Sequence, residues 1–216
     1  LELGNEPELY GSFAWYVASD GHRVTGRPHG YAPADFERDF RRIGSGLPRV
    51  PLAGPTTGAP KWMAALPSFL RSPRLGLITM HRYPLQQCFI PTWHPWYPTV
   101  AHLFAPVASR GLANSVAPYV RMAHDAHHLP FRVDEMSTIS CGPGALGQSF
   151  ASALWMVDAL FEMARVGADG VNIHSYPGAP YALFDLNNAG GRWTARVYPQ
   201  YYGMPVSYTH LRAHET

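Results

Sequence analysis

FRVDEMSTISCGPG, residues 131–144, reads as a short buried strand that ends on an acid and runs into a glycine-rich loop. Phe131 and Val133 alternate with charged residues, which is the period-two pattern of a strand, and the Cys-Gly-Pro-Gly run cannot continue one. Glu135 therefore stands at the end of the strand. In parallel α/β folds the carboxyl ends of strands converge on the active site, so Glu135 is a candidate for chemistry. The alternative is a charged strand end that faces solvent.

Strand and helix patterns alternate on both sides of this stretch. Strands are expected at residues 1–3, 49–53, 75–80 and 170–174, and helices at residues 33–42, 61–70, 99–128 with a break near Gly111, and 148–166. Residues 8–32 are expected to form a long loop. The alternation predicts parallel strands with right-handed crossovers, hence an α/β doubly wound sheet or a (β/α) barrel. Candidate residues at several strand ends favour the barrel.

Composition narrows the class of partner. A chain of 216 residues suits one domain with a real core. A net charge of +2 argues against a surface that binds nucleic acid. The sequence contains no run of about 18 apolar residues, so no membrane-spanning helix is expected. The 13% aromatic content is compatible with a carbohydrate cleft.

The chain opens at Leu1 inside an apolar, strand-like stretch, so we expect a fragment, in which the lack of a signal peptide is uninformative. Cys88 and Cys141 each follow a predicted strand. From the residues alone, one disulfide and two unrelated thiols are both open.

Glu6 is a second acid at a strand end. Gly4 to Pro7, GNEP, stops the first expected strand because proline cannot continue a ladder. Glu6 and Glu135 are thus equivalent in position. Paired carboxyls suit glycoside hydrolysis, in which one protonates the leaving oxygen and the other attacks the sugar or activates water. The alternative is two unrelated surface acids.

Several segments resemble a known family. LELGNEPELY and FRVDEMSTISC resemble the glycoside hydrolases of clan A, and HRYPLQQC, PTVAHLFAPVAS, FASALWMVDALFEMARVGADGVNIHSYPGAPYALF and RVYPQYYGM resemble, in order, family 79, the heparanase-like β-glucuronidases. The resemblance implies that residues 1–204 are the C-terminal five-strand portion, strands 4 to 8, of a (β/α)8 TIM barrel truncated at both ends. Residues 205–216 break the pattern and are expected to be a non-native tail.

The resemblance also implies catalytic roles. Glu6 would be the acid/base and Glu135 the nucleophile of a retaining exo-β-glucuronidase that acts on a glucuronide or related glycan. Asn5 would contact the 2-hydroxyl of the sugar. Tyr83 would hydrogen-bond the nucleophile, and His81 is a further candidate for substrate binding.

A second set of residues is implied to bind the glucuronate carboxylate: Tyr181 and the backbone of the loop from Gly142 to Gly144. Ser137-Thr138 stands where relatives often have Asn-Ser, which leaves the fine specificity open. Cys88 and Cys141 fall in loops at the same barrel mouth, and we therefore predict that they form a disulfide. A disulfide implies a secreted or periplasmic parent protein.

Other functions remain as alternatives: a carbohydrate-binding pseudoenzyme with the same cleft, a clan A glycosidase for a neutral sugar, or a doubly wound cofactor enzyme. No strand is followed by a complete phosphate-binding glycine motif, and no cofactor is expected. His124, His127 and His128 lack the spacing of a zinc site, so no metal is expected. Trp93, Trp96 and Tyr97 are expected either to stack on sugar or to pack over the barrel lip.

Overall fold

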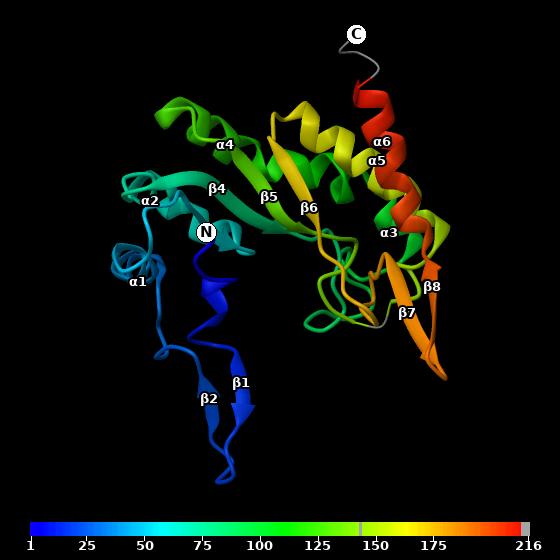
Figure 1. Ribbon diagram of the computed structural model, residues 1–216, viewed down its shortest axis with the longest axis horizontal. Helices are drawn as coiled ribbons and strands as arrows, with labels where there is room; N and C mark the ends of the chain where they lie inside the picture. The colour runs from blue at the N-terminus through cyan, green and yellow to red at the C-terminus, as the bar shows by residue number, and fades with distance from the viewer. Residues whose placement is uncertain (143, 213–216) are drawn as a thin grey trace. The chain divides into compact units, whose positions relative to one another are not determined.

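The computed structural model describes residues 1–142 and 144–212 (Figure 1). The chain falls into two compact units, the first made of Leu1–His81 with Pro118–Asp134 and the second of Arg82–Ala117 with Glu135–Thr216. The boundaries fall inside strands β4 (Leu75–Arg82) and β5 (Phe131–Met136) and helix α4 (Arg110–His127).

Four strands pair in one parallel sheet. Its strands are β3 (Leu52–Thr57), β4 (Leu75–Arg82), β5 (Phe131–Met136) and β6 (Gly170–Ile173), and they lie in the order of the chain. The predicted α/β class with parallel strands is confirmed. The expected strand at residues 1–3 supplies one isolated bridge, from Glu2 to Ala53, so the sheet has four strands where five were expected.

The first unit packs one amphipathic helix on β3. Helix α1 (Pro33–Ser45) buries Phe36 and Phe40, which lie four residues apart on one face. The ring centroid of Phe40 lies 4.8 Å from that of Phe69 in α2 (Leu66–Phe69). A Cβ added at Gly54 of β3 would lie 2.9 Å from the Phe40 ring, so only glycine lets the helix approach the strand this closely.

Two expectations in this unit are wrong. The strand expected at residues 49–53 lies at Leu52–Thr57 and runs through Gly54 and Pro55, because the proline falls beside a register irregularity. The loop expected at residues 8–32 contains a 3-10 turn, η1 (Pro7–Leu9), and an antiparallel hairpin of β1 (Ala14–Val17) and β2 (Arg23–Thr25) (Figure 1). The hairpin has little buried surface, so the sequence carries no clear alternation to announce it.

Proline also shapes the helices. The helix expected at residues 61–70 is a 3-10 segment, η2 (Pro60–Ala65), followed by the short α2, each with proline in its first turn. The helix expected at residues 99–128 is divided into α3 (Val100–Leu103), η3 (Pro106–Ala108) and α4 (Arg110–His127). The break thus precedes Gly111, at the segment around Pro106.

The second unit pairs two helices. Helix α5 (Phe150–Arg165) lies beside α6 (Pro199–Arg212) (Figure 1). A Cβ at Gly203 of α6 would lie 2.5 Å from the Ala153 carbonyl oxygen, so the helices meet closely there. Residues 205–212, expected to be part of a non-native tail, continue α6, whereas residues 213–216 lie outside the described residues. An unexpected hairpin of β7 (Phe184–Ala189) and β8 (Arg192–Val197) precedes α6.

Candidate active site

Glu135 is held from two directions within the second unit. The Tyr83 hydroxyl donates a 2.6 Å hydrogen bond to Glu135 Oε1, and His174 Nδ1 lies 3.0 Å from the same oxygen. The Tyr83 hydroxyl oxygen and His174 Nδ1 are 2.9 Å apart. Tyr83 directly follows β4, Glu135 belongs to β5 and His174 directly follows β6. The ends of three parallel strands thus supply three groups that meet at one carboxylate oxygen.

Tyr181 packs beside this group. Its ring centroid lies 6.0 Å from that of Tyr83 and 5.3 Å from that of His174, and its side chain is buried. Burial, followed by the neighbouring Tyr176 hydroxyl, raises the pKa of Tyr181 to about 12. The hydroxyl therefore stays neutral at ordinary pH and can donate a hydrogen bond.

Gly144 lies against Pro180, the residue before Tyr181. A Cβ added at Gly144 would lie 2.0 Å from the Pro180 carbonyl oxygen, and Gly142 adopts a positive φ of 115°. A disulfide joins Cys88 and Cys141, with 5.9 Å between their Cα atoms, as predicted. The bridge ties the loop after β5 to the loop after β4.

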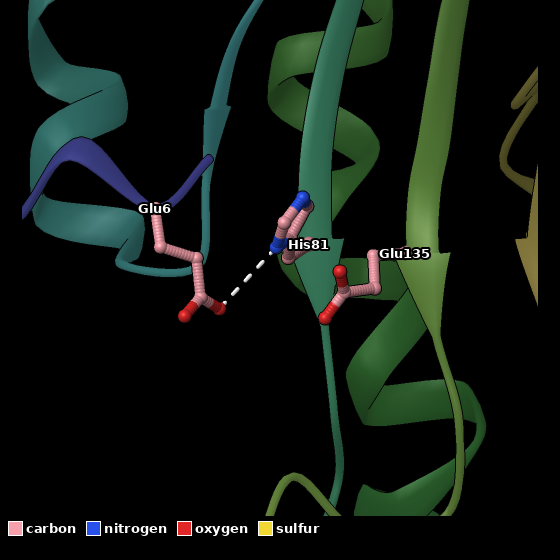
Figure 2. A group of neighbouring side chains, drawn as sticks. All are labelled: Glu6, His81 and Glu135. Atoms are coloured by element: carbon pink, nitrogen blue, oxygen red, sulfur yellow. Dashed lines mark hydrogen bonds and ion pairs between the residues drawn. The ribbon is translucent and has the colours of Figure 1, made fainter. Parts of the chain in front are cut away.

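Glu6, in the first unit, is set by its backbone and by one imidazole. It has a left-handed conformation, with φ 47° and ψ 60°, and its amide donates to the Thr56 carbonyl oxygen at 2.9 Å. Its Oε1 lies 3.3 Å from His81 Nδ1 on β4 (Figure 2). Asn5, just before Glu6, is exposed, and its backbone N–H donates a 2.8 Å hydrogen bond to the Tyr10 hydroxyl oxygen.

A second acid shares this loop. Glu8 accepts a 2.7 Å hydrogen bond from the Thr57 hydroxyl and a 2.6 Å bond from the Gly58 amide. Burial raises the pKa of Glu8 and the charge of Glu6 acts in the same direction, while the Thr57 hydrogen bond opposes them. A Cβ at Gly58 would lie 2.8 Å from Glu6 Oε1, so glycine leaves room for the carboxyl groups.

His81 connects Glu6 to the interior. The side chain of His81 is 3% exposed, and its Nε2 lies 3.4 Å from Oδ2 of Asp134 on β5, whose side chain is 4% exposed. Each ring nitrogen therefore faces a carboxylate oxygen, Nδ1 toward Glu6 and Nε2 toward Asp134.

The structure distributes the predicted site residues between its two units. The first unit holds Asn5, Glu6 and His81; the second holds Tyr83, Glu135, Gly142, Gly144 and Tyr181. Sequence reasoning missed three groups that touch these residues: Glu8, Asp134 and His174. The signal for His174 was available, because it ends the predicted strand at residues 170–174. No comparable pattern pointed to the burial of Asp134.

A cavity of about 860 Å³ lies elsewhere in the first unit. It is lined by residues that include Phe40, Leu52 and Leu75. Leu52 and Leu75 begin β3 and β4, whereas the candidate residues follow the strands' carboxyl ends. The cavity therefore contributes nothing to the candidate site.

Comparison with solved structures supports the fold. The chain is similar to a 4-O-α-L-rhamnosyl-β-D-glucuronidase from Fusarium oxysporum 12S, with a TM-score of 0.65 and 15% identity over 95% of this chain and 42% of that one. It is also similar to a GH39 enzyme from Xanthomonas axonopodis pv. citri, with a TM-score of 0.60 and 16% identity over 97% and 40% of the two chains. A third similar structure is a monomeric β-xylosidase from Caulobacter crescentus CB15, with a TM-score of 0.58 and 18% identity over 98% of this chain and 41% of that one.

These likenesses establish a shared fold, at identities too low to establish more. The chain spans about two fifths of the length of each of these three structures. No family model matches the sequence, and no curated protein matches it. Among the described residues, no helix combines the length and apolar character that crossing a membrane requires.

Proposed function

We propose that the protein is a retaining glycoside hydrolase that removes β-linked glucuronic acid from the end of a glycan, with Glu135 as nucleophile and Glu6 as acid/base. The observation that carries the proposal is the 2.6 Å hydrogen bond from Tyr83 to Glu135 at the end of a parallel strand. A hydrogen bond to a charged oxygen fixes the orientation of a carboxylate, which an attacking nucleophile requires.

The proposed reaction has two displacements. A Glu135 oxygen attacks the anomeric carbon while the bond to the leaving oxygen breaks and Glu6 gives that oxygen its proton. Glu6 then takes a proton from water, the water oxygen attacks the anomeric carbon, and the bond to Glu135 breaks. A retaining enzyme needs its two carboxyl groups roughly 5 to 5.5 Å apart. A crystal structure with a bound glucuronide analogue would test that separation.

The proposed sugar has a carboxylate that neutral donors would bind. Tyr181 keeps its proton and packs beside Tyr83, and Gly144 lies against Pro180, next to Tyr181. We assign these groups to the glucuronate carboxylate and Asn5 to the 2-hydroxyl. A similar fold in a protein described as a glucuronidase is consistent with this substrate class.

Three broader assignments are part of the proposal. Residues 1–204 would belong to a partial (β/α)8 barrel, supported by the parallel sheet and by the structures of similar fold. Residues 205–216 would lie outside it, and the helical course of residues 205–212 in α6 is the observation that weighs against this boundary. The Cys88–Cys141 disulfide supports a secreted or periplasmic location.

The test uses the full-length protein that contains this chain and an aryl β-glucuronide that releases nitrophenol. Glu135→Gln should lower kcat by on the order of 10⁵-fold, because a nucleophile is lost without a change of shape. Glu37→Gln is the matched control, since Glu37 of α1 pairs with Arg41 of the same helix and accepts a hydrogen bond from Ser68 of α2. Undiminished turnover by the Glu135 variant would refute the assignment. Hydrolysis of an aryl β-xyloside alone would indicate a neutral sugar, and binding without hydrolysis would indicate a pseudoenzyme.

A further inference from the structure

Three titratable side chains of the first unit, those of Glu6, His81 and Asp134, form a row of successive contacts. Oε1 of Glu6 lies 3.3 Å from His81 Nδ1, and His81 Nε2 lies 3.4 Å from Asp134 Oδ2. The side chains of His81 and Asp134 are almost completely buried, while that of Glu6 is 27% exposed. The row thus has one end near solvent, at the proposed acid/base, and runs inward from it.

Glu2 interacts with Asp134 at the other end of the row and is itself exposed. Burial and the adjacent carboxyl of Asp134 raise the pKa of Glu2 to about 7, while Thr79 and His81 oppose this rise. Asp134 Oδ1 is buried and makes no hydrogen bond within residues 1–142 and 144–212. A neutral Glu2 carboxyl beside Asp134 adds no second negative charge there.

The chemistry of imidazole restricts where protons can lie in this row. A neutral imidazole has one nitrogen that donates and one that accepts, whereas an ionised carboxylate can only accept. A hydrogen on Nε2 of His81 is therefore favourable 3.4 Å from the Asp134 carboxylate oxygen, whereas a bare lone pair there would be repelled. The contact between Nδ1 and Glu6 Oε1 then needs one proton, carried by either atom. If neither atom carried it, two acceptors would face each other.

We propose that Asp134 is a positioning residue that, through His81, holds one proton between His81 Nδ1 and Glu6 Oε1. The catalytic role of this proton rests on the proposed function, in which Glu6 gives a proton to the leaving oxygen. During that step the proton moves from the His81–Glu6 contact to the leaving oxygen, and Nε2 keeps its hydrogen on Asp134. The second displacement returns a proton from water to the same contact.

The first test reads the protons directly and does not require activity. Long-range ¹⁵N–¹H correlation spectra of the histidine-labelled, full-length protein report which ring nitrogens carry hydrogen, and His81→Gln identifies the His81 signals. The wild-type protein should show hydrogen on Nε2 of His81. A neutral ring with hydrogen on Nδ1 alone would overturn the proposal, and this measurement does not depend on any variant folding.

Asp134→Asn sharpens the test. The amide can donate to Nε2, so the hydrogen of His81 should shift wholly or partly to Nδ1, as expected when an acceptor-only partner is lost. Asp125→Asn, on the exposed face of α4, is the matched control and should leave the His81 signals unchanged. An unaltered His81 spectrum in folded Asp134→Asn would also overturn the proposal.

A kinetic measurement separates this proposal from the proposed function. For a glucuronide with a poor leaving group, Asp134→Asn should lower kcat roughly tenfold to hundredfold and change the pH profile, because general-acid transfer is impaired. A glucuronide with a good leaving group should be affected less. Wild-type kinetics with both substrates would count against a positioning role. If the NMR result is as expected but no glycoside is hydrolysed, the row stands and the proposed function fails.

Discussion

The two proposed catalytic glutamates differ in what surrounds them. One oxygen of Glu135 is contacted by a hydroxyl at 2.6 Å and an imidazole at 3.0 Å, with a neutral tyrosine packed alongside. Glu6 has one imidazole at 3.3 Å and shares its loop with a second acid, Glu8. Environments that treat two carboxyl groups differently are how enzymes assign a base or nucleophile and an acid. The comparison supports Glu135 as the attacking group and Glu6 as the proton donor.

After Glu135→Gln, the largest expected effect that would break this comparison is that of a substitution at Glu6. Glu6→Gln in the full-length protein should lower kcat by roughly 10²- to 10⁴-fold for a glucuronide with a poor leaving group, because that oxygen needs a proton as it departs. With a good leaving group the first displacement should be affected much less. Burst and steady-state kinetics on a series of aryl glucuronides measure the difference. Equal losses across the series would show that Glu6 is not the proton donor.

A smaller effect is expected at the support of Glu135. Tyr83→Phe removes the 2.6 Å hydrogen bond to a charged group, which contributes about 1.5–3 kcal/mol, so kcat should fall roughly tenfold to hundredfold. Tyr119→Phe is a suitable control, since the Tyr119 hydroxyl donates its hydrogen bond to the Pro60 carbonyl oxygen and has no part in the proposed site. Steady-state kinetics on an aryl β-glucuronide measure both variants. Equal kcat values for Tyr83→Phe and wild type would remove the main support for the nucleophile.

The smallest effect concerns stability at Glu2, which is exposed beside the buried Asp134. The folded pKa of Glu2 is raised from 4.5 to about 7, so folding favours its neutral form. The folded state loses stability as pH rises from about 4.5 to 7, where the unfolded chain ionises first. Glu2→Gln should therefore match wild type at pH 4 and be more stable at pH 8. Partial exposure limits the gain to on the order of 1 kcal/mol.

Urea unfolding at pH 4 and pH 8 measures this difference. Glu37→Gln, at an acid of α1 that is paired with Arg41, should show no comparable gain at pH 8. A Glu2→Gln protein that is no more stable than wild type at either pH would show that Glu2 ionises freely. In that case Asp134 would have no neutral neighbour at its buried oxygen.

Part of the fold and site was predictable because the signals are local. Period-two alternation and the breakers that follow it predicted β4, β5 and β6 to within a few residues. The helical pattern predicted α1 and α5. The two hairpins were missed because exposed strands need no apolar alternation.

The sequence by itself determined that Glu6 and Glu135 stand at the ends of strand-like stretches, because apolar alternation and the breakers that follow it are local signals. The contacts of each glutamate were decided only by the tertiary structure. Glu135 meets Tyr83 and His174, and Glu6 meets His81, only when segments far apart in the chain are packed together. Asp134 and Glu135 are neighbours in sequence, yet one is buried against His81 while the other meets Tyr83. Successive side chains of a strand point to opposite faces, and packing decides what each face contacts.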